Sequence, residues 1–399
     1  MTFRSMWADL LPVGRTSSGG YRRFAWTTPD MACREWFRAE AARRSMAVET
    51  DRNGNLWAWL GAPGDGAFVT GSHLDSVPGG GAYDGPLGIV TAFAALDELT
   101  ARGVTPTRPI AIVAFCDEEG GRFGVACLGS RLAAGVAEPA RTLALTDADG
   151  MTLAEAMRAQ GHDPADVGTD PQALARIGMF VELHVEQGRA LVDLGSPLGL
   201  ATAIWPHGRW RFDFDGEGNH AGTTALADRR DPMLTYAMTV LAARKRARLA
   251  GALATFGKVR VDPGGTNAIA AAVTGWLDSR APDEATLAAV VAEITEQSAE
   301  RAGRDGVTLT VTPESTSPLV EFPGGPLDWA AGVLGDPPRL PTGAGHDAGV
   351  LAAAGVPTVM LFVRNPTGVS HAPAEFAEEA DCLAGVAALA DLLTDAACR

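Results

Sequence analysis

Apolar residues follow two different patterns along the chain. Short, nearly continuous apolar runs recur in GAFVTGSH, RPIAIVAFCDEEG, GMFVELHVEQG and PTVMLFVRN. Between the first two, GPLGIVTAFAALDELTARG spaces its apolar residues as a helix does. Continuous apolar strands joined by helices are typical of a parallel sheet that is covered on both faces. This pattern therefore predicts an α/β fold with a mostly parallel sheet.

The middle of the chain has the other pattern. GRWRFDFDG alternates aromatic and charged residues, as a strand with one face in water does. Helices are expected over 231–250 and 283–302, with strands in ATFGKVRV and AAVTGWLDSR between them and in VTLTVTPE after them. This order is that of the split βαβ, or ferredoxin-like, arrangement. We predict an inserted α+β domain at 208–317, and a second domain formed by 1–207 plus 318–399.

Length and charge narrow the classes of partner. The 399 residues are enough for two packed cores, and the formal net charge of -15 disfavours nucleic acids and anionic membranes as partners. The chain has no apolar run long enough for a membrane span and no signal-peptide pattern at its start, which predicts a cytoplasmic protein with a small-molecule substrate. Its five cysteines lack CxxC spacing, so reduced thiols are expected.

Histidines and carboxylates gather where the predicted strands end. Ligands of open parallel sheets bind at the carboxyl ends of the strands, so these side chains should meet in one crevice. The set comprises His73, Asp75, Asp84, Glu118, Glu119, His184 and His371. Each residue alone is as well explained by helix capping or core packing. The ordered set favours two divalent ions bridged by a carboxylate, and imidazole and carboxylate ligands suit zinc, manganese, cobalt or nickel.

Seven motifs identify a family. GSHLDSVPGGGAYDG, CDEEGGRF, ELHVEQG, GNHAGTT, RRDP, TGAGHDA and VSHAPAE resemble, in this order, the motifs of the M20-type binuclear metallohydrolases. The resemblance covers nearly the whole chain and points to the branch of N-carbamoyl-L-amino acid hydrolases and allantoate amidohydrolases. Peptidase relatives usually carry an acidic ligand where this chain has His184, and this position selects the amidase branch.

The resemblance implies a role for each residue of the metal centre. Asp84 would bridge two ions, one also held by His73 and His184 and the other by Glu119 and His371. Asp75 would orient the imidazole of His73. Glu118 would be the general base, which takes a proton from the metal-bound water and passes it to the leaving nitrogen.

The same resemblance assigns substrate contacts. His220 would polarise the scissile carbonyl, and in this family it usually reaches the active site of the partner subunit, so a homodimer through the inserted lid domain is expected. Asn267 and Arg280 would hold the substrate carboxylate. For Arg280 alone, a strand-end salt bridge is the alternative. Gln187, Gly345 and His346 are expected in the substrate pocket. GAGHDA also fits a G-x-G-x-x-A pattern, but no strand is expected before it, so a dinucleotide site is not predicted.

The predicted activity is metal-dependent hydrolysis of a linear carbon–nitrogen bond in an N-carbamoyl amino acid or allantoate. One alternative is a deacylase of an N-formyl or N-formimino acidic amino acid, such as N-formylglutamate. It would use Arg364, at the end of the last apolar strand, to bind a second carboxylate, unless Arg364 pairs with an acid such as Glu375 or Glu378. The other alternative is a non-catalytic protein that binds a ligand in the same cleft.

Overall fold

The computed structural model describes residues 2–397 and divides into two compact units. The first unit combines the chain up to Ala203 with the chain from Glu321 onward. The second unit is continuous from Ile204 to Val320, and its bounds lie a few residues outside the predicted 208–317. The second unit is therefore an insertion in the sequence of the first.

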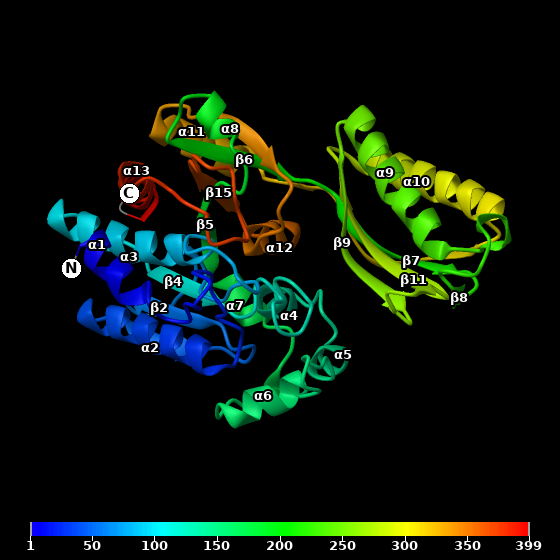
Figure 1. Ribbon diagram of the computed structural model, residues 1–399. Helices are drawn as coiled ribbons and strands as arrows, with labels where there is room; N and C mark the ends of the chain where they lie inside the picture. The colour runs from blue at the N-terminus through cyan, green and yellow to red at the C-terminus, as the bar shows by residue number, and fades with distance from the viewer. Residues whose placement is uncertain (1, 398–399) are drawn as a thin grey trace. The chain divides into compact units, whose positions relative to one another are not determined.

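A nine-stranded sheet forms the centre of the first unit (Figure 1). Its four middle strands are parallel and follow the order β4-β3-β5-β15. On one side, β2 pairs antiparallel with β4, and β1 pairs antiparallel with β2. On the other side, β6 pairs antiparallel with β15, and β13 and β14 pair with β6. The bounds are β1 Ala47–Thr50, β2 Leu56–Leu60, β3 Ala67–His73, β4 Ile110–Phe115, β5 Ile177–Val185, β6 Leu198–Ile204, β13 Val320–Glu321, β14 Arg339–Thr342 and β15 Thr358–Val363. The predicted mostly parallel sheet is confirmed.

Helices cover this sheet because its strands are apolar on both faces. Helices α3 and α13 pack against each other, and α11 packs against α13 and β15. The larger core lies among these helices, α1, α2 and the sheet, and a smaller core lies around α4 and α6. The bounds are α1 Phe3–Leu10, α2 Thr28–Arg43, α3 Pro86–Ala101, α4 Leu128–Ala133, α5 Pro139–Leu143, α6 Leu153–Ala159, α7 Pro171–Ala175, α8 Ala190–Asp193, α11 Gly324–Leu334, α12 Asp347–Ala353 and α13 Glu379–Ala397.

One expectation about the GAGHDA segment was wrong. Strand β14 does precede it, and the segment connects this strand to α12, whose N-cap is His346. The strand was missed because it is short and only one of its residues, Leu340, is buried, so it carries no apolar run. It pairs with β6 and lies off the path of the parallel strands, so it provides no Rossmann-type context for a dinucleotide.

The second unit is an antiparallel sheet covered by two helices (Figure 1). Its strand order is β12-β7-β11-β9, and α9 and α10 pack against each other and the sheet. The core lies between the sheet and these helices, around Phe212, Phe214 and Leu277. A separate pair, β8 and β10, forms a small ribbon. The bounds are β7 His207–Asp215, β8 Asn219–His220, α9 Pro232–Ala250, β9 Leu253–Asp262, β10 Ala268–Ile269, β11 Ala272–Arg280, α10 Glu284–Asp305 and β12 Thr308–Ser317. The predicted inserted α+β fold is confirmed.

Two further expectations concern thiols and membranes. Cys33, Cys116, Cys127 and Cys382 are free and buried, whereas Cys398 lies outside the described residues. Within residues 2–397, none of the helices is both long enough and apolar enough to span a bilayer.

Candidate metal centre and active site

The ends of three neighbouring strands carry the central acids and histidines. His73 is the last residue of β3, His184 lies near the end of β5, and Glu118 and Glu119 follow β4 in the next turn. Asp84 comes just before α3. Its neighbour Gly85 has a φ of 83°, and a Cβ at this glycine would collide with the imidazole of His73. The glycine therefore allows the chain to pass close enough for Asp84 to face the histidine.

The carboxylate of Asp84 lies between two groups of possible metal ligands. Its Oδ1 atom is 3.4 Å from Nε2 of His73 and 3.2 Å from Nε2 of His184. Its Oδ2 atom is 3.3 Å from Nε2 of His371, and this Nε2 is 3.4 Å from Oε2 of Glu119. Two three-residue groups able to hold a metal ion therefore share Asp84.

The buried imidazoles present a free nitrogen to this centre. The Nδ1–H group of His73 donates to the backbone oxygen of Asp75 (3.2 Å), and that of His184 donates to the backbone oxygen of Val185 (2.8 Å). Both Nε2 atoms are buried and have no hydrogen-bond partner within residues 2–397. Ligand atoms about 2.0–2.1 Å from one tetrahedral ion stand roughly 3.3–3.4 Å apart, close to the distances from Asp84. These residues fit a divalent ion.

Asp75 connects the two strand ends. Its carboxylate oxygens accept hydrogen bonds from the backbone N–H groups of Glu118 (3.1 Å) and Glu119 (3.0 Å), and Oδ1 is 3.5 Å from Nδ1 of His73. The side chain of Asp75 therefore holds the turn after β4, in which Asp117 has a left-handed φ of 55°, while its backbone oxygen accepts the Nδ1–H of His73. In this turn the two adjacent glutamates point to different partners.

Glu118 points toward His73, and its carboxylate is buried. Its Oε2 atom is 3.6 Å from Nε2 of His73, and the thiol of Cys127 donates to its Oε1 atom (3.3 Å). Burial raises the pKa of Glu118 well above its usual value; His73 opposes this rise, while Asp347 and Glu119 add to it. Burial and the nearby charge of Asp84 raise the pKa of Glu119 to about 8. A carboxylate with a raised pKa is suited to proton transfer near neutral pH.

The second unit places its predicted substrate residues at two ends of the sheet. His220 pairs with Ala268, and the backbone N–H of Ala221 donates to the oxygen of Asn267 (3.0 Å), so His220 and Asn267 lie together. Arg280 is the last residue of the nine-residue β11. At roughly 3.3 Å per residue, the two ends of β11 are about 26 Å apart. The structure therefore does not bring Asn267 and Arg280 of one chain together.

The side chains of His220 and Arg280 each have a defined contact. The backbone N–H of Gly222 donates to Nδ1 of His220 (3.0 Å), so a neutral imidazole carries its proton on Nε2, which is free to donate. Arg280 Nε donates to Oδ1 of Asp278 (2.9 Å), as the salt-bridge alternative expects. This contact leaves the predicted role of Arg280 untested.

The family follows from comparison with known proteins. The sequence pattern of peptidase family M20/M25/M40 matches residues 69–395. The chain belongs to peptidase family M20/M25/M40. It is 37% identical over 391 residues to the N-carbamoyl-L-amino acid amidohydrolase of Geobacillus stearothermophilus. The matched region covers 96% of this chain and 94% of that protein. It is 31% identical to the allantoate amidohydrolase of Escherichia coli (strain K12), over 98% of this chain and 97% of that protein.

Solved structures agree with this family. This chain is similar to the crystal structure of an amidase of the hydantoinase/carbamoylase family from Burkholderia vietnamiensis, with a TM-score of 0.88 and 29% sequence identity. The match covers 100% of this chain and 98% of the amidase chain. The predicted M20 resemblance and the predicted hydrolase class are confirmed.

The M20 centre contains buried acids that sequence reasoning missed. Glu375, considered only as a surface partner of Arg364, is buried and lies beside Asp84. Glu182 is fully buried and accepts from the hydroxyl of Ser72 (2.8 Å) and the backbone N–H of Ala348 (2.9 Å). The sequence did contain a signal for Glu182. Residues two apart on a strand lie on the same face, so Glu182 is expected on the face that carries His184.

Two other predicted pocket residues lie near the same centre. Gln187 Nε2 donates to Oδ2 of Asp84 (2.7 Å) and is 3.3 Å from Nε2 of His371. Gln187 therefore contacts Asp84, which belongs to both candidate metal-binding groups, and His371, which belongs to one of them. The ring of His346 lies 4.5 Å from that of His184, between centroids. Burial lowers the pKa of His346 well below its usual value, so this imidazole is neutral. Gly345, the residue before His346, is exposed.

Arg364 has a partner other than the expected ones. Its Nε and Nη2 atoms donate to the two carboxylate oxygens of Asp381, at 2.8 and 2.9 Å. Asp381 is buried, and this two-point contact replaces the expected pairing with Glu375 or Glu378. The structure therefore favours the ion-pair alternative over a role for Arg364 in binding a second carboxylate.

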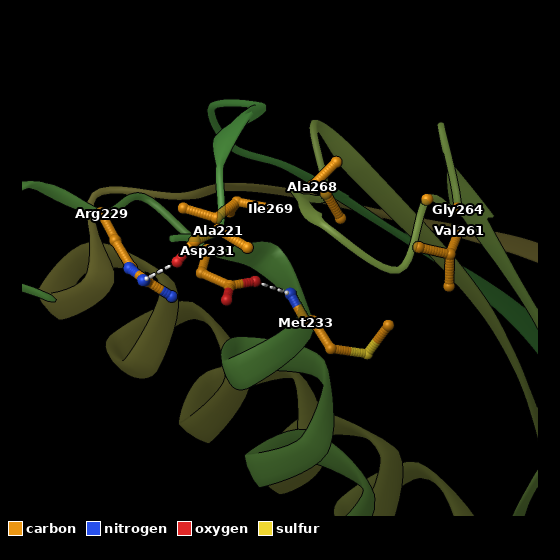
Figure 2. Close-up of a pocket in the computed structure, with 10 residues that line it drawn as sticks. Ala221, Arg229, Asp231, Met233, Val261, Gly264, Ala268 and Ile269 are labelled. Atoms are coloured by element: carbon orange, nitrogen blue, oxygen red, sulfur yellow. Dashed lines mark hydrogen bonds between the residues drawn. The ribbon is translucent and has the colours of Figure 1, made fainter. Parts of the chain in front are cut away.

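A cavity of about 370 Å³ lies in the second unit (Figure 2). It is lined by residues of this unit alone, including Arg229, Met233 and Ile269. The guanidinium of Arg229 donates to the backbone oxygens of Ala221 (2.8 Å) and Thr224 (3.1 Å). Arg229 therefore holds the turn that follows His220.

Proposed function

We propose that this M20 protein hydrolyses the linear carbon–nitrogen bond of an N-carbamoyl amino acid or of allantoate. The observation that carries the proposal is the position of Glu118, a buried carboxylate 3.6 Å from Nε2 of His73, beside two ligand groups that share Asp84. A non-catalytic binding protein would need the ligands but not this base. The similarity to relatives named for these two substrates supports the choice of bond.

The proposed ligands divide between two divalent ions. His73 and His184 would hold one ion, Glu119 and His371 the other, and Asp84 both. The ions, when bound, polarise the carbonyl and lower the pKa of water. The carbonyl acceptors on Nδ1 of His73 and His184 keep each Nε2 lone pair directed at the centre.

Glu118 is the proposed general base. Its carboxylate accepts the proton of the attacking water as the new carbon–oxygen bond forms, and then donates it to the nitrogen as the carbon–nitrogen bond breaks. For an N-carbamoyl amino acid, the products are the free amino acid and carbamic acid, which decomposes to carbon dioxide and ammonia. The thiol of Cys127 and the main chain held by Asp75 keep the carboxylate in place.

His220 is proposed to donate its Nε2–H to the substrate carbonyl, and Asn267 and Arg280 to hold the substrate carboxylate. Because Asn267 and Arg280 lie at opposite ends of β11, they can bind one carboxylate only if they come from two chains. We therefore propose that a second copy supplies His220 and Asn267 to each active site.

The second unit has a surface suited to this dimer. Four apolar side chains on α9 are between 46% and 62% exposed: Leu234, Met238, Leu241 and Leu249. The neighbouring β9 is an edge strand and exposes Leu253 and Val259. Exposed apolar stripes and unpaired strand edges are the features that self-association covers. A two-fold contact through α9 and β9 would bury them.

The test is ammonia release by the metal-loaded protein. We expect turnover of N-carbamoyl-L-amino acids or allantoate, and none by protein stripped of metal. N-formylglutamate serves as the comparison substrate for the deacylase alternative. Its hydrolysis yields formate and glutamate and no ammonia, so release of free glutamate is measured for this compound. The deacylase alternative loses structural support because Arg364 donates to both carboxylate oxygens of Asp381. Tight binding without hydrolysis of any of these compounds would instead indicate the non-catalytic alternative.

A further inference from the structure

Residues 19–25 lie beside the loop that leads to Asp84. The backbone N–H of Tyr21 donates to the oxygen of Gly80 (3.0 Å), and the backbone N–H of Gly79 donates to the oxygen of Tyr21 (2.8 Å). The two segments therefore pair as antiparallel strands do. Successive side chains of such an extended segment point to opposite faces.

The side chains of this segment alternate between buried and accessible positions. Tyr21, Arg23 and Ala25 are buried, whereas Arg22 is exposed and Phe24 is partly exposed. Arg22 and Phe24 therefore share the outer face, and the guanidinium carbon of Arg22 lies 5.0 Å from the centroid of the Phe24 ring. Stacking on an aromatic ring restricts a guanidinium and leaves its N–H groups able to donate.

The same segment contacts the loops of two other proposed ligands. A Cβ at Gly121, two residues after Glu119, would lie 3.3 Å from two ring atoms of Phe24. A Cβ on the glycine that begins the segment would lie 3.8 Å from the Cβ of Pro373, two residues after His371. The segment therefore borders the proposed metal centre on the side of Glu119 and His371, and the Phe24 ring connects its outer face to this border.

Arg22 is a cation without an ion-pair partner within residues 2–397. Two arginines in the neighbouring loops are paired, Arg122 with Asp147 (3.0 Å) and Arg364 with Asp381 (2.8 Å). A guanidinium that is held on a ring and has no acid beside it is suited to a carboxylate, which it can bind through two N–H groups. Beside a site for amino-acid derivatives, the substrate can supply this carboxylate.

The candidate substrates differ in the number of carboxylates that they carry. Each N-carbamoyl amino acid has an α-carboxylate, which the proposed function already assigns to Asn267 and Arg280. Allantoate also has a single carboxylate. A further cation at the border of the centre suits a second carboxylate, and N-carbamoyl aspartate and N-carbamoyl glutamate carry one in their side chains.

We propose that Arg22 binds the side-chain carboxylate of an N-carbamoyl acidic amino acid, and that the protein prefers such substrates to their neutral analogues. The inference rests on the proposed function and specifies the side chain of its substrate. Arg364 was expected to bind a second carboxylate, and its pairing with Asp381 leaves this role to Arg22. A site that binds a charged group discriminates against an analogue that lacks the charge.

The test compares N-carbamoyl-L-glutamate with N-carbamoyl-L-glutamine, which have nearly the same shape and differ in the charge of the side chain. Release of free glutamate or glutamine gives kcat/KM for each compound. We expect the metal-loaded wild-type protein to prefer the glutamate compound. Arg22→Gln removes the cation and should lower the glutamate-to-glutamine ratio of kcat/KM about tenfold. Arg22→Lys keeps the charge without the planar fork and should retain part of the preference.

A matched control is Arg15→Gln. Arg15 is exposed as Arg22 is, but it pairs with Tyr21 on the side of the segment opposite to Gly80. Its replacement removes the same charge and should leave the ratio unchanged. Calorimetric binding of both compounds to Glu118→Gln protein, with and without Arg22→Gln, repeats the comparison without turnover.

Three results would overturn the inference. Equal losses on both compounds in Arg22→Gln would show that Arg22 contacts a group that the two share. An equal fall of the ratio in Arg15→Gln would show a general effect of surface charge instead of a contact. Hydrolysis of the glutamine compound at an equal or higher kcat/KM by the wild-type protein would refute the inference and leave the proposed function standing.

Failure of the proposed function has a different signature. The metal-loaded protein would then hydrolyse neither compound nor allantoate. In that case the calorimetric comparison still decides the inference, because tighter binding of the glutamate compound that is lost in Arg22→Gln would support it, and equal binding of the two compounds would refute it.

Discussion

The carboxylate of Glu375 accepts a hydrogen bond from the backbone N–H of Asp84 (2.9 Å), and the same oxygen accepts one from the backbone N–H of Tyr83 (2.8 Å). The close approach requires Gly81, where a Cβ would collide with the Glu375 side chain. Ser370 adds a hydroxyl that lies 3.2 Å from Glu375 and 3.3 Å from Asp84. The segment that carries His371 therefore also positions Asp84, the proposed shared ligand.

Replacing Glu375 should weaken metal binding although Glu375 touches no ion. Glu375→Ala removes the acceptor of two backbone N–H groups and frees the backbone at Asp84. Loss of such supporting contacts typically lowers metal affinity about 10- to 100-fold. Competition with a chelator of known affinity measures the change. Glu378→Ala, at an exposed acid three residues on, is the control, and equal affinity of the two variants would contradict the prediction.

Metal binding should tighten as the pH rises from 6 to 9. In the metal-free protein the hydrogen bond to Asp84 and nearby carboxylates raise the pKa of His371 to about 9, and burial raises the pKa of Glu119 to about 8. Both groups are therefore protonated at pH 7 and must lose their protons to bind an ion. Titration calorimetry in buffers of different ionisation enthalpy should detect proton release at pH 7. An affinity independent of pH would show that these groups are not ligands.

Glu118→Gln should abolish most activity while the ions stay bound. The substitution keeps the shape of the side chain and removes its ability to accept a proton, so kcat should fall roughly 10² to 10⁴-fold. Glu119→Gln is the matched comparison, because it should lose metal from the His371 group. The opposite pattern, with metal lost from Glu118→Gln, would mean that the roles of the two glutamates are exchanged.

Two inactive variants should restore each other in mixed dimers. Glu118→Gln lacks the base in its own centre, and His220→Ala lacks the group proposed to act on the partner's substrate. A dimer of one chain of each kind contains one site with both groups intact. Activity should return after subunit exchange, which labelled chains can verify. Verified exchange without recovery would place His220 in the active site of its own chain.

Several features of this protein could be predicted from the sequence because their causes are local. Continuous apolar runs and period-two alternation depend on which faces of a strand are buried, and they identified β3, β4, β5, β7 and β15 and the insertion. Motif residues next to strand ends identified the candidate ligands His73, Asp84 and His184, because parallel strands bring their carboxyl ends to one edge.

Other features were decided only by the tertiary structure, because they depend on contacts between distant parts of the chain. The apolar pattern could not show that Glu375 would reach back to Asp84, or that Arg364 would pair with Asp381. Asn267 and Arg280 are near in sequence, yet an extended strand separates them by its whole length. A side chain's partner is set by sheet order and register, and the periodicity of a single segment contains neither.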